Sequence, residues 1–165
     1  MTTTDDGSGT IRISREFPAP AALLFRQWTE IESLREWFAP DGYEVTLAEA
    51  DARPGGHWRV DYRSADGSSI TEAGRYERLQ PPVALAFTLQ HRFGDGSLGP
   101  ETRVSVTFTE LGDRTRMEFS QSGILSPQMR DGYRSGWGSC FDKLEAHNTA
   151  ACGNRQEAIH AQHGS

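Results

Sequence analysis

Three side chains of this chain could do acid–base chemistry if the fold brings them together. His91 carries an imidazole that can serve as a general acid or base near neutral pH. Glu72 shares a strand-like face with Ile70, where apolar surroundings would raise the pKa of its carboxyl, although Thr71 is an equally good inward residue. Tyr133 adds a phenol from a helical segment. His91, Glu72 and Tyr133 are therefore the candidate catalytic residues, and each also has a plain structural interpretation as a satisfied polar group.

The elements that must position these groups are mostly strands. Apolar and polar residues alternate in a series of short segments, and turn residues such as Pro54-Gly55-Gly56, Asp66-Gly67 and Gly112-Asp113 separate several of them. The predicted strands cover residues 10–17, 43–52, 57–62, 70–79, 83–93, 104–108 and 115–121. Their short connections favour an antiparallel sheet.

Helical patterns interrupt the strands after the first one and follow the last one. Residues 21–28 and 31–38 form two short helical stretches that stop near Pro40, and Thr29 with Glu32 has the spacing of a capping box. A long helix is predicted from Ser126 to about Asn148, with Pro127 at its first position. Its apolar stripe consists of Met129, Tyr133, Trp137, Phe141 and Leu144. Three glycines inside this helix, Gly132, Gly136 and Gly138, require an explanation such as a close approach of the backbone to a strand or a ligand.

Composition excludes several classes of protein. The net charge is −6 and no basic stripe is present, so nucleic-acid binding is not expected. No run of about 18 apolar residues could span a membrane, and nothing at the start resembles a signal peptide, which predicts a cytoplasmic protein. Cys140 and Cys152 have no disulfide or zinc spacing. The five histidines show no ligand pattern and no nucleotide or hydrolase motif occurs, so we expect neither a metal nor a cofactor.

The domain organisation expected from this pattern is simple. Residues 10–148 form one domain, and residues 1–9 and 149–165 are polar segments without periodicity that we expect to be disordered.

A series of short motifs along residues 11–147 carries a family resemblance. They are Phe17-Pro18-Ala19-Pro20 before Phe25 and Trp28; Trp37-Phe38 followed by Pro40-Asp41-Gly42; Pro54-Gly55-Gly56 before Trp58; Asp66-Gly67; Gly74-x-Tyr76; Thr102 to Phe108; and Gly136-Trp137 ahead of Leu144. In this order they resemble the helix-grip folds of the START and birch-pollen-allergen (SRPBCC) superfamily. Within it, the chain is similar to the bacterial single-domain form of the family named after the activator of the heat-shock-protein-90 ATPase.

This resemblance implies an α+β helix-grip fold, in which a curved antiparallel sheet of about six or seven strands wraps around the long C-terminal helix. Such folds hold a cavity between sheet and helix, and strand and helix periodicity indicates the side chains that face it. A slip of one residue would turn a strand's other face inward. The expected lining residues are Trp58, Val60, Tyr62, Phe87, Leu89, His91, Val104, Val106, Phe108, Met117, Phe119, Gln121, Tyr133, Trp137 and Phe141, with Trp37 and Phe38 near the mouth.

Two main functions remain open. The first is a binding protein for an apolar or aromatic small molecule, and the second is a cofactor-free enzyme of the cyclase, dehydratase or hydrolase type that uses the same cavity. A protein-interaction role is a weaker alternative, and chaperone contact is not favoured because this chain has no room for the second domain of the eukaryotic activator. A filled core, without a pocket, is the structural alternative to both main functions. An unpaired strand edge could support a homodimer.

Overall fold

The computed structural model describes residues 2–5 and 9–163, and the side chains of residues 9–148. The described residues form eight strands and three helices. In order they are β1 (Thr2–Asp5), β2 (Ile11–Phe17), α1 (Ala21–Thr29), α2 (Ile31–Trp37), β3 (Tyr43–Ala50), β4 (His57–Ser64), β5 (Ser69–Gln80), β6 (Ala84–Phe93), β7 (Thr102–Leu111), β8 (Arg114–Ser122) and α3 (Pro127–His163).

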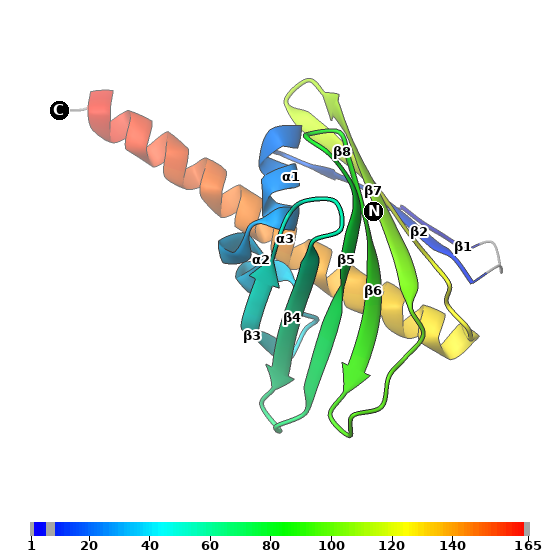
Figure 1. Cartoon of the computed structure of the whole chain (residues 1–165). Helices are drawn as coiled ribbons and strands as arrows, with labels where there is room; N and C mark the ends of the chain where they lie inside the picture. The colour runs from blue at the N-terminus through cyan, green and yellow to red at the C-terminus, as the bar shows by residue number, and fades with distance from the viewer. Residues whose placement is uncertain (1, 6–8, 164–165) are drawn as a thin grey trace.

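All of these strands belong to one antiparallel sheet in the order β1-β2-β8-β7-β6-β5-β4-β3. The sheet curves around α3, which crosses its concave side diagonally, while α1 and α2 lie at one end of the sheet (Figure 1). The predicted helix-grip fold is thereby confirmed. Seven of the strands, β2 to β8, correspond to the predicted ones.

The long helix begins as predicted but extends further. The hydroxyl of Ser126 accepts a hydrogen bond from the backbone N–H of Met129 at 3.1 Å, which caps the first turn. The helix continues to His163, beyond the predicted end at Asn148. The predictions of disorder for residues 1–9 and 149–165 stay predictions, because the side chains of residues 1–8 and 149–165, and part of their backbone, lie outside the described residues.

The junction of the two short helices differs from the predicted capping box. Thr29 is the last residue of α1, and its hydroxyl donates back to the carbonyl of Phe25 at 3.1 Å. The backbone of Glu30 then occupies the N-cap of α2, without a side-chain cap. The hydroxyl of Thr29 is therefore used to end one helix and does not begin the next.

The core lies between the sheet, α1, α2 and the middle of α3, and aromatic side chains fill it. Trp28 stands at its centre, with its ring centroid 4.8 Å from that of Trp37 and 5.9 Å from that of Trp137. Phe119 of β8 packs at 4.7 Å against Trp137. Such ring pairs add to the free energy gained from buried apolar area, so this end of the molecule is well packed.

Candidate functional site

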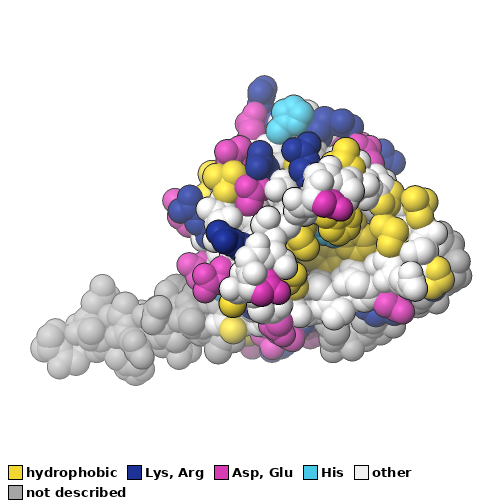
Figure 2. Space-filling view, turned by 90° about the horizontal axis from the view of Figure 1, so that it is seen from below, with side chains coloured by type: hydrophobic (Ala, Val, Ile, Leu, Met, Phe, Trp, Pro, Cys, Tyr) yellow, Lys and Arg dark blue, Asp and Glu magenta, His cyan; other side chains and the backbone are white. Residues whose placement is uncertain are grey.

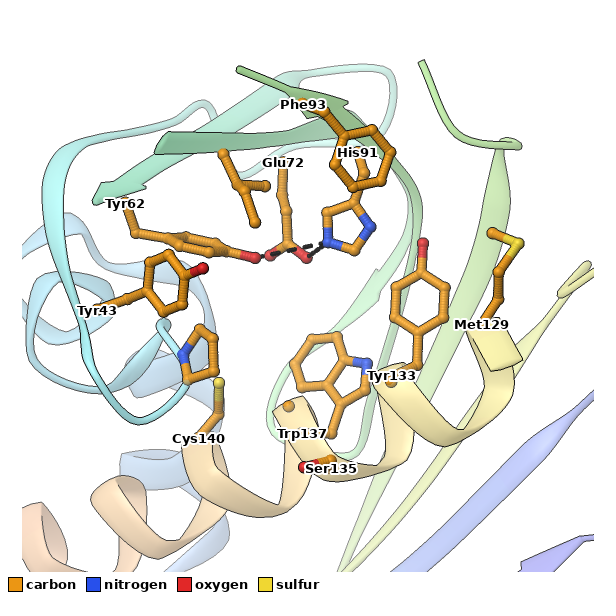
Figure 3. Close-up of a pocket in the computed structure, with 14 residues that line it drawn as sticks. Tyr43, Tyr62, Glu72, His91, Phe93, Met129, Tyr133, Ser135, Trp137 and Cys140 are labelled. Carbon is orange, nitrogen blue, oxygen red and sulfur yellow. Dashed lines mark hydrogen bonds and ion pairs between the residues drawn. The ribbon is translucent and has the colours of Figure 1, made fainter. Parts of the chain in front are cut away.

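A cavity of about 440 Å³ lies beside this core, between the sheet and the first turns of α3. Its walls come from β3, β4, β5, β6, α3 and the segment before β3 (Figure 3). Seen from the side where the cavity opens, hydrophobic side chains surround a hollow in the surface (Figure 2). The lining residues are Pro40, Tyr43, Tyr62, Ile70, Glu72, His91, Phe93, Met129, Gly132, Tyr133, Ser135, Gly136, Trp137 and Cys140.

A buried acid–base pair forms one wall of this cavity. Glu72 of β5 and His91 of β6 are direct partners in the antiparallel register, so both side chains point to the same face of the sheet. His91 Nε2 lies 2.5 Å from Glu72 Oε1, and the two side chains are only 16% and 9% exposed. The short distance and the burial make this a charge-assisted hydrogen bond or ion pair.

Two tyrosines hold the pair from opposite sides (Figure 3). The hydroxyl of Tyr62, on β4, lies 3.5 Å from His91 Nε2. The ring of Tyr133, on α3, stacks on the imidazole of His91 with 4.9 Å between centroids and 13° between planes. The stacking fixes the orientation of the imidazole, because the ring cannot turn without losing this contact.

The negative charge of Glu72 acts on groups across the cavity. Burial raises the pKa of the Tyr62 hydroxyl, and the charge of Glu72 raises it further. Burial followed by the charge of Glu72 likewise raises the pKa of Tyr133 and of the Cys140 thiol. All three groups are therefore neutral at physiological pH and can donate hydrogen bonds to a bound molecule.

The glycines of α3 leave the cavity open on its helical side. A Cβ atom placed on Gly132 or Gly136 would meet no other atom within 4 Å. The close backbone approach to a strand that the sequence suggested is therefore absent at these two positions, which face empty space. A close approach occurs in β5 instead, where a Cβ atom on Gly74 would lie 1.8 Å from the carbonyl oxygen of Thr88.

The structure brings together all three candidate catalytic residues and part of the expected lining. Glu72 and His91 lie on the sheet side, Tyr133 stacks on His91 from α3, and the expected lining residues Tyr62 and Trp137 also border the cavity. Nine lining residues were not among the predicted ones: Pro40, Tyr43, Ile70, Phe93, Met129, Gly132, Ser135, Gly136 and Cys140. The helical spacing of Met129, Gly132, Gly136 and Cys140 was the available signal for one side of the cavity.

The other expected lining residues do not face this cavity, because side chains fill the space that they surround. All of them are buried in the core and absent from the cavity wall: Trp37, Phe38, Trp58, Val60, Phe87, Leu89, Val104, Val106, Phe108, Met117, Phe119, Gln121 and Phe141. Trp37 and Phe38, which were expected near the mouth, pack under α3. The filled-core alternative is thus correct for one half of the interior.

Gln121 has a structural position in a buried hydrogen-bond chain. Its amide oxygen accepts from Trp137 Nε1 at 2.9 Å, and its amide nitrogen donates to Thr102 Oγ1 at 2.8 Å. Thr102 in turn donates to the carbonyl of Leu89 at 2.8 Å. Every member of this chain has a partner, so Gln121 fixes the indole that borders the cavity.

The part of the chain that the structure describes contains neither a cluster of metal-ligating side chains nor a membrane-spanning helix. No group of three metal-ligating side chains is found among those residues. Likewise, none of the described helices is long and apolar enough to cross a membrane.

Comparison with protein families gives one match. Residues 18–148 match the model of the family described as Activator of Hsp90 ATPase homolog 1-like protein (AHSA1). The chain belongs to this family. The AHSA1 match includes the Glu72–His91 pair and the whole helical side of the cavity.

Solved structures of bacterial proteins share the fold of this AHSA1-family chain. A protein from Chromobacterium violaceum is 27% identical, with a TM-score of 0.75 over 85% of this chain and 96% of that chain. The AHSA1 protein from Silicibacter pomeroyi is 23% identical, with a TM-score of 0.78 over 86% of this chain and 99% of that one. A protein from Arthrobacter aurescens, at 18% identity, has a TM-score of 0.81 over 90% and 91%. None of the curated proteins compared with this chain matches it.

Proposed function

We propose that this AHSA1-family protein binds a small, mainly apolar or aromatic molecule in the cavity between the sheet and α3. The observation that supports the proposal is the cavity itself, whose volume of about 440 Å³ falls in the range of small-molecule sites. Its walls are largely aromatic and aliphatic, with few polar groups at defined positions. The family and its superfamily commonly bind hydrophobic ligands, which agrees with this composition.

The Glu72–His91 pair would orient the bound molecule. Both side chains are nearly buried and already bonded to each other, so a polar group of the ligand gains a bond there at little cost in side-chain ordering. The apolar part of the ligand would then lie toward Tyr43, Phe93 and Met129.

A fluorescent probe and a variant that fills the cavity test this proposal. N-phenyl-1-naphthylamine is uncharged and fluoresces in apolar sites, and we expect it to bind saturably to the wild-type protein. Gly136→Leu places a side chain in open space and should abolish this binding. The free energy of unfolding of this variant should not fall, because leucine is more favourable than glycine in a helix by up to about 1 kcal/mol.

Ser139→Leu is the matched control, because it adds the same side chain to α3 at a position that does not line the cavity. It should bind the probe as the wild type does. Equal binding by the wild type and Gly136→Leu, or no saturable binding by the wild type, would contradict the proposal. Native mass spectrometry of freshly purified protein would further show whether an apolar molecule accompanies the chain.

The Glu72–His91 pair also supports a second candidate function, a cofactor-free enzyme that transfers protons. A carboxylate and an imidazole 2.5 Å apart in a largely apolar cavity are suited to general acid–base chemistry on a bound carbonyl compound. If a molecule identified by mass spectrometry is converted on incubation, Glu72→Gln should lower the rate by about 10²–10⁴-fold while the molecule still binds. Unchanged turnover in Glu72→Gln would show that this carboxylate takes no part in the reaction, and no conversion by the wild type would leave binding alone as the function.

A further inference from the structure

The cavity wall carries one acidic side chain and no basic one apart from His91. Among the described residues that line it, Glu72 is the only carboxylate, and neither Arg nor Lys is present. Lys143 lies one helical turn beyond Cys140, but its ammonium group binds the backbone carbonyls of Ala39 and Pro40 at 2.7 and 3.1 Å. Its ammonium group is thus bound to the backbone of the segment before β3 and is not itself part of the cavity wall.

Aromatic rings surround the space in front of this carboxylate. Tyr43 and Tyr62 meet edge to face with centroids 5.4 Å apart, and Trp137 and Tyr133 stand opposite them on α3 (Figure 3). The faces of phenol and indole rings carry partial negative charge and attract cations, most strongly where water is excluded. A positively charged group in this space would therefore meet favourable charge on two sides.

The influence of Glu72 across the cavity agrees with this picture. Its charge contributes to the raised pKa of Tyr62 on β4 and of Tyr133 and Cys140 on α3, after the effect of burial. Glu72 thus contributes a negative potential that reaches both the strand side and the helix side of the cavity. An anion entering the cavity would be repelled by this carboxylate.

Glu72 retains capacity for a ligand even though it binds His91. An ionised carboxylate has about four lone-pair sites on two oxygens, and His91 Nε2 lies against only one of these oxygens. A ligand ammonium could bind the remaining sites.

We propose that the ligand of this cavity is a cation, namely an aromatic or apolar molecule that carries an amine. The ammonium group binds Glu72 within the rings of Tyr43, Tyr62 and Trp137, and the apolar body fills the space beside Gly132 and Gly136. This inference rests on the proposed binding function and specifies its ligand class.

Three probes of one shape and different charge test the inference. 4-Phenylbutylamine, 4-phenylbutanol and 4-phenylbutyrate would each be used to displace N-phenyl-1-naphthylamine at about pH 7, where the amine is protonated and the acid ionised. We expect the amine to bind at least about tenfold more tightly than the alcohol. The carboxylate should bind most weakly of the three.

The variant Glu72→Gln tests whether the carboxylate of Glu72 causes the preference for the amine over the alcohol. Glutamine has nearly the same shape as glutamate and no charge, so in this variant the ratio of the amine affinity to the alcohol affinity should fall to about one. Glu118→Gln, which removes an exposed carboxylate from β8 outside the cavity wall, is the matched control and should keep the preference.

The outcomes separate this inference from the proposed function. If N-phenyl-1-naphthylamine binds and the alcohol or the acid equals or exceeds the amine, the cavity binds ligands but the cationic class is wrong. A preference for the amine that survives in Glu72→Gln would also overturn the inference. If the fluorescent probe does not bind at all, both the function and the ligand class fail.

Discussion

Two stretches of the same helix face the same sheet and produce opposite results. Trp137, Phe141 and Leu144 of α3 meet Trp28, Phe119 and their neighbours and fill the space on their face of the helix, while Cys140 beside them still lines the cavity. Between Met129 and Gly136, two glycines face open space and a cavity remains. The difference teaches that side-chain volume along one helix decides where a helix-grip interior is core and where it is a binding site.

Trp137 is the boundary between these two regions. One part of its indole lines the cavity, and another packs on Phe119 and donates to Gln121. Its removal would therefore disturb both regions at once, and substitutions on either side of it separate them better.

The largest expected effect belongs to the filled region. Phe119→Ala should lower the free energy of unfolding by about 3–5 kcal/mol, because it leaves a void in a closely packed aromatic cluster. Urea denaturation measures this loss. Binding of N-phenyl-1-naphthylamine to the folded variant should change little, and a loss of binding comparable to that in Gly136→Leu would show that the two regions are not separate.

A smaller loss is expected at the boundary. Gln121→Leu removes the acceptor of Trp137 Nε1 and leaves a buried N–H without a partner, which costs about 1–3 kcal/mol. Because the indole is then free to shift, the affinity for the probe should fall as well. Loss of stability with unchanged affinity would mean that packing alone holds Trp137 in place.

Alkaline pH should lower the free energy of unfolding through Tyr62 in the cavity wall. Tyr62 has an ordinary pKa of 10.0 in the unfolded chain and a higher pKa in the folded protein, so its contribution to stability is complete below pH 10.0 and is lost as the pH rises further. The free energy of unfolding should fall by about 1.4 kcal/mol per pH unit for each such group. Tyr62→Phe should make this fall less steep in urea titrations between about pH 9 and 11. A slope equal to that of the wild type would contradict the assignment.

The smallest expected effect is a gain in stability. Gly132→Ala should raise the free energy of unfolding by about 1 kcal/mol, because alanine favours the helix and its methyl group enters open space. Gly74→Ala is the contrasting variant, since its methyl group would collide with the Thr88 carbonyl and the protein should be destabilised. Thermal unfolding compares the two, and a destabilised Gly132→Ala would mean that no open space lies beside this part of α3.

The helices and strands of this fold could be predicted because the apolar residues of each element recur with the period of a helix or a strand. Ser126 and Pro127 marked the start of α3 and the alternation of apolar residues marked the strands, since these signals depend only on local geometry. Periodicity could not separate core from cavity. Phe119 and Tyr62 both point inward from their strands, and only the side chains opposite them on α3 decide which of the two meets empty space.

The Glu72–His91 pair is a second feature that the sequence pattern could not predict. Each residue could be assigned to a face, but their direct pairing depends on the register of β5 and β6, which shifts between Tyr76 and Arg78. A sequence pattern does not reveal such a shift in pairing. The three glycines of α3 were the most useful local signal, although the sequence alone did not show that two of them face empty space.

Lys143 gives this protein a built-in reporter. It is the only lysine in the sequence, and its ammonium group lies 2.7 Å from the carbonyl oxygen of Ala39 and 3.5 Å from that of Tyr43, which itself borders the cavity. An amine-reactive label therefore has a single side chain to modify, and it can do so only when these carbonyls release the ammonium group. The rate of labelling at Lys143 measures how often this wall of the cavity opens.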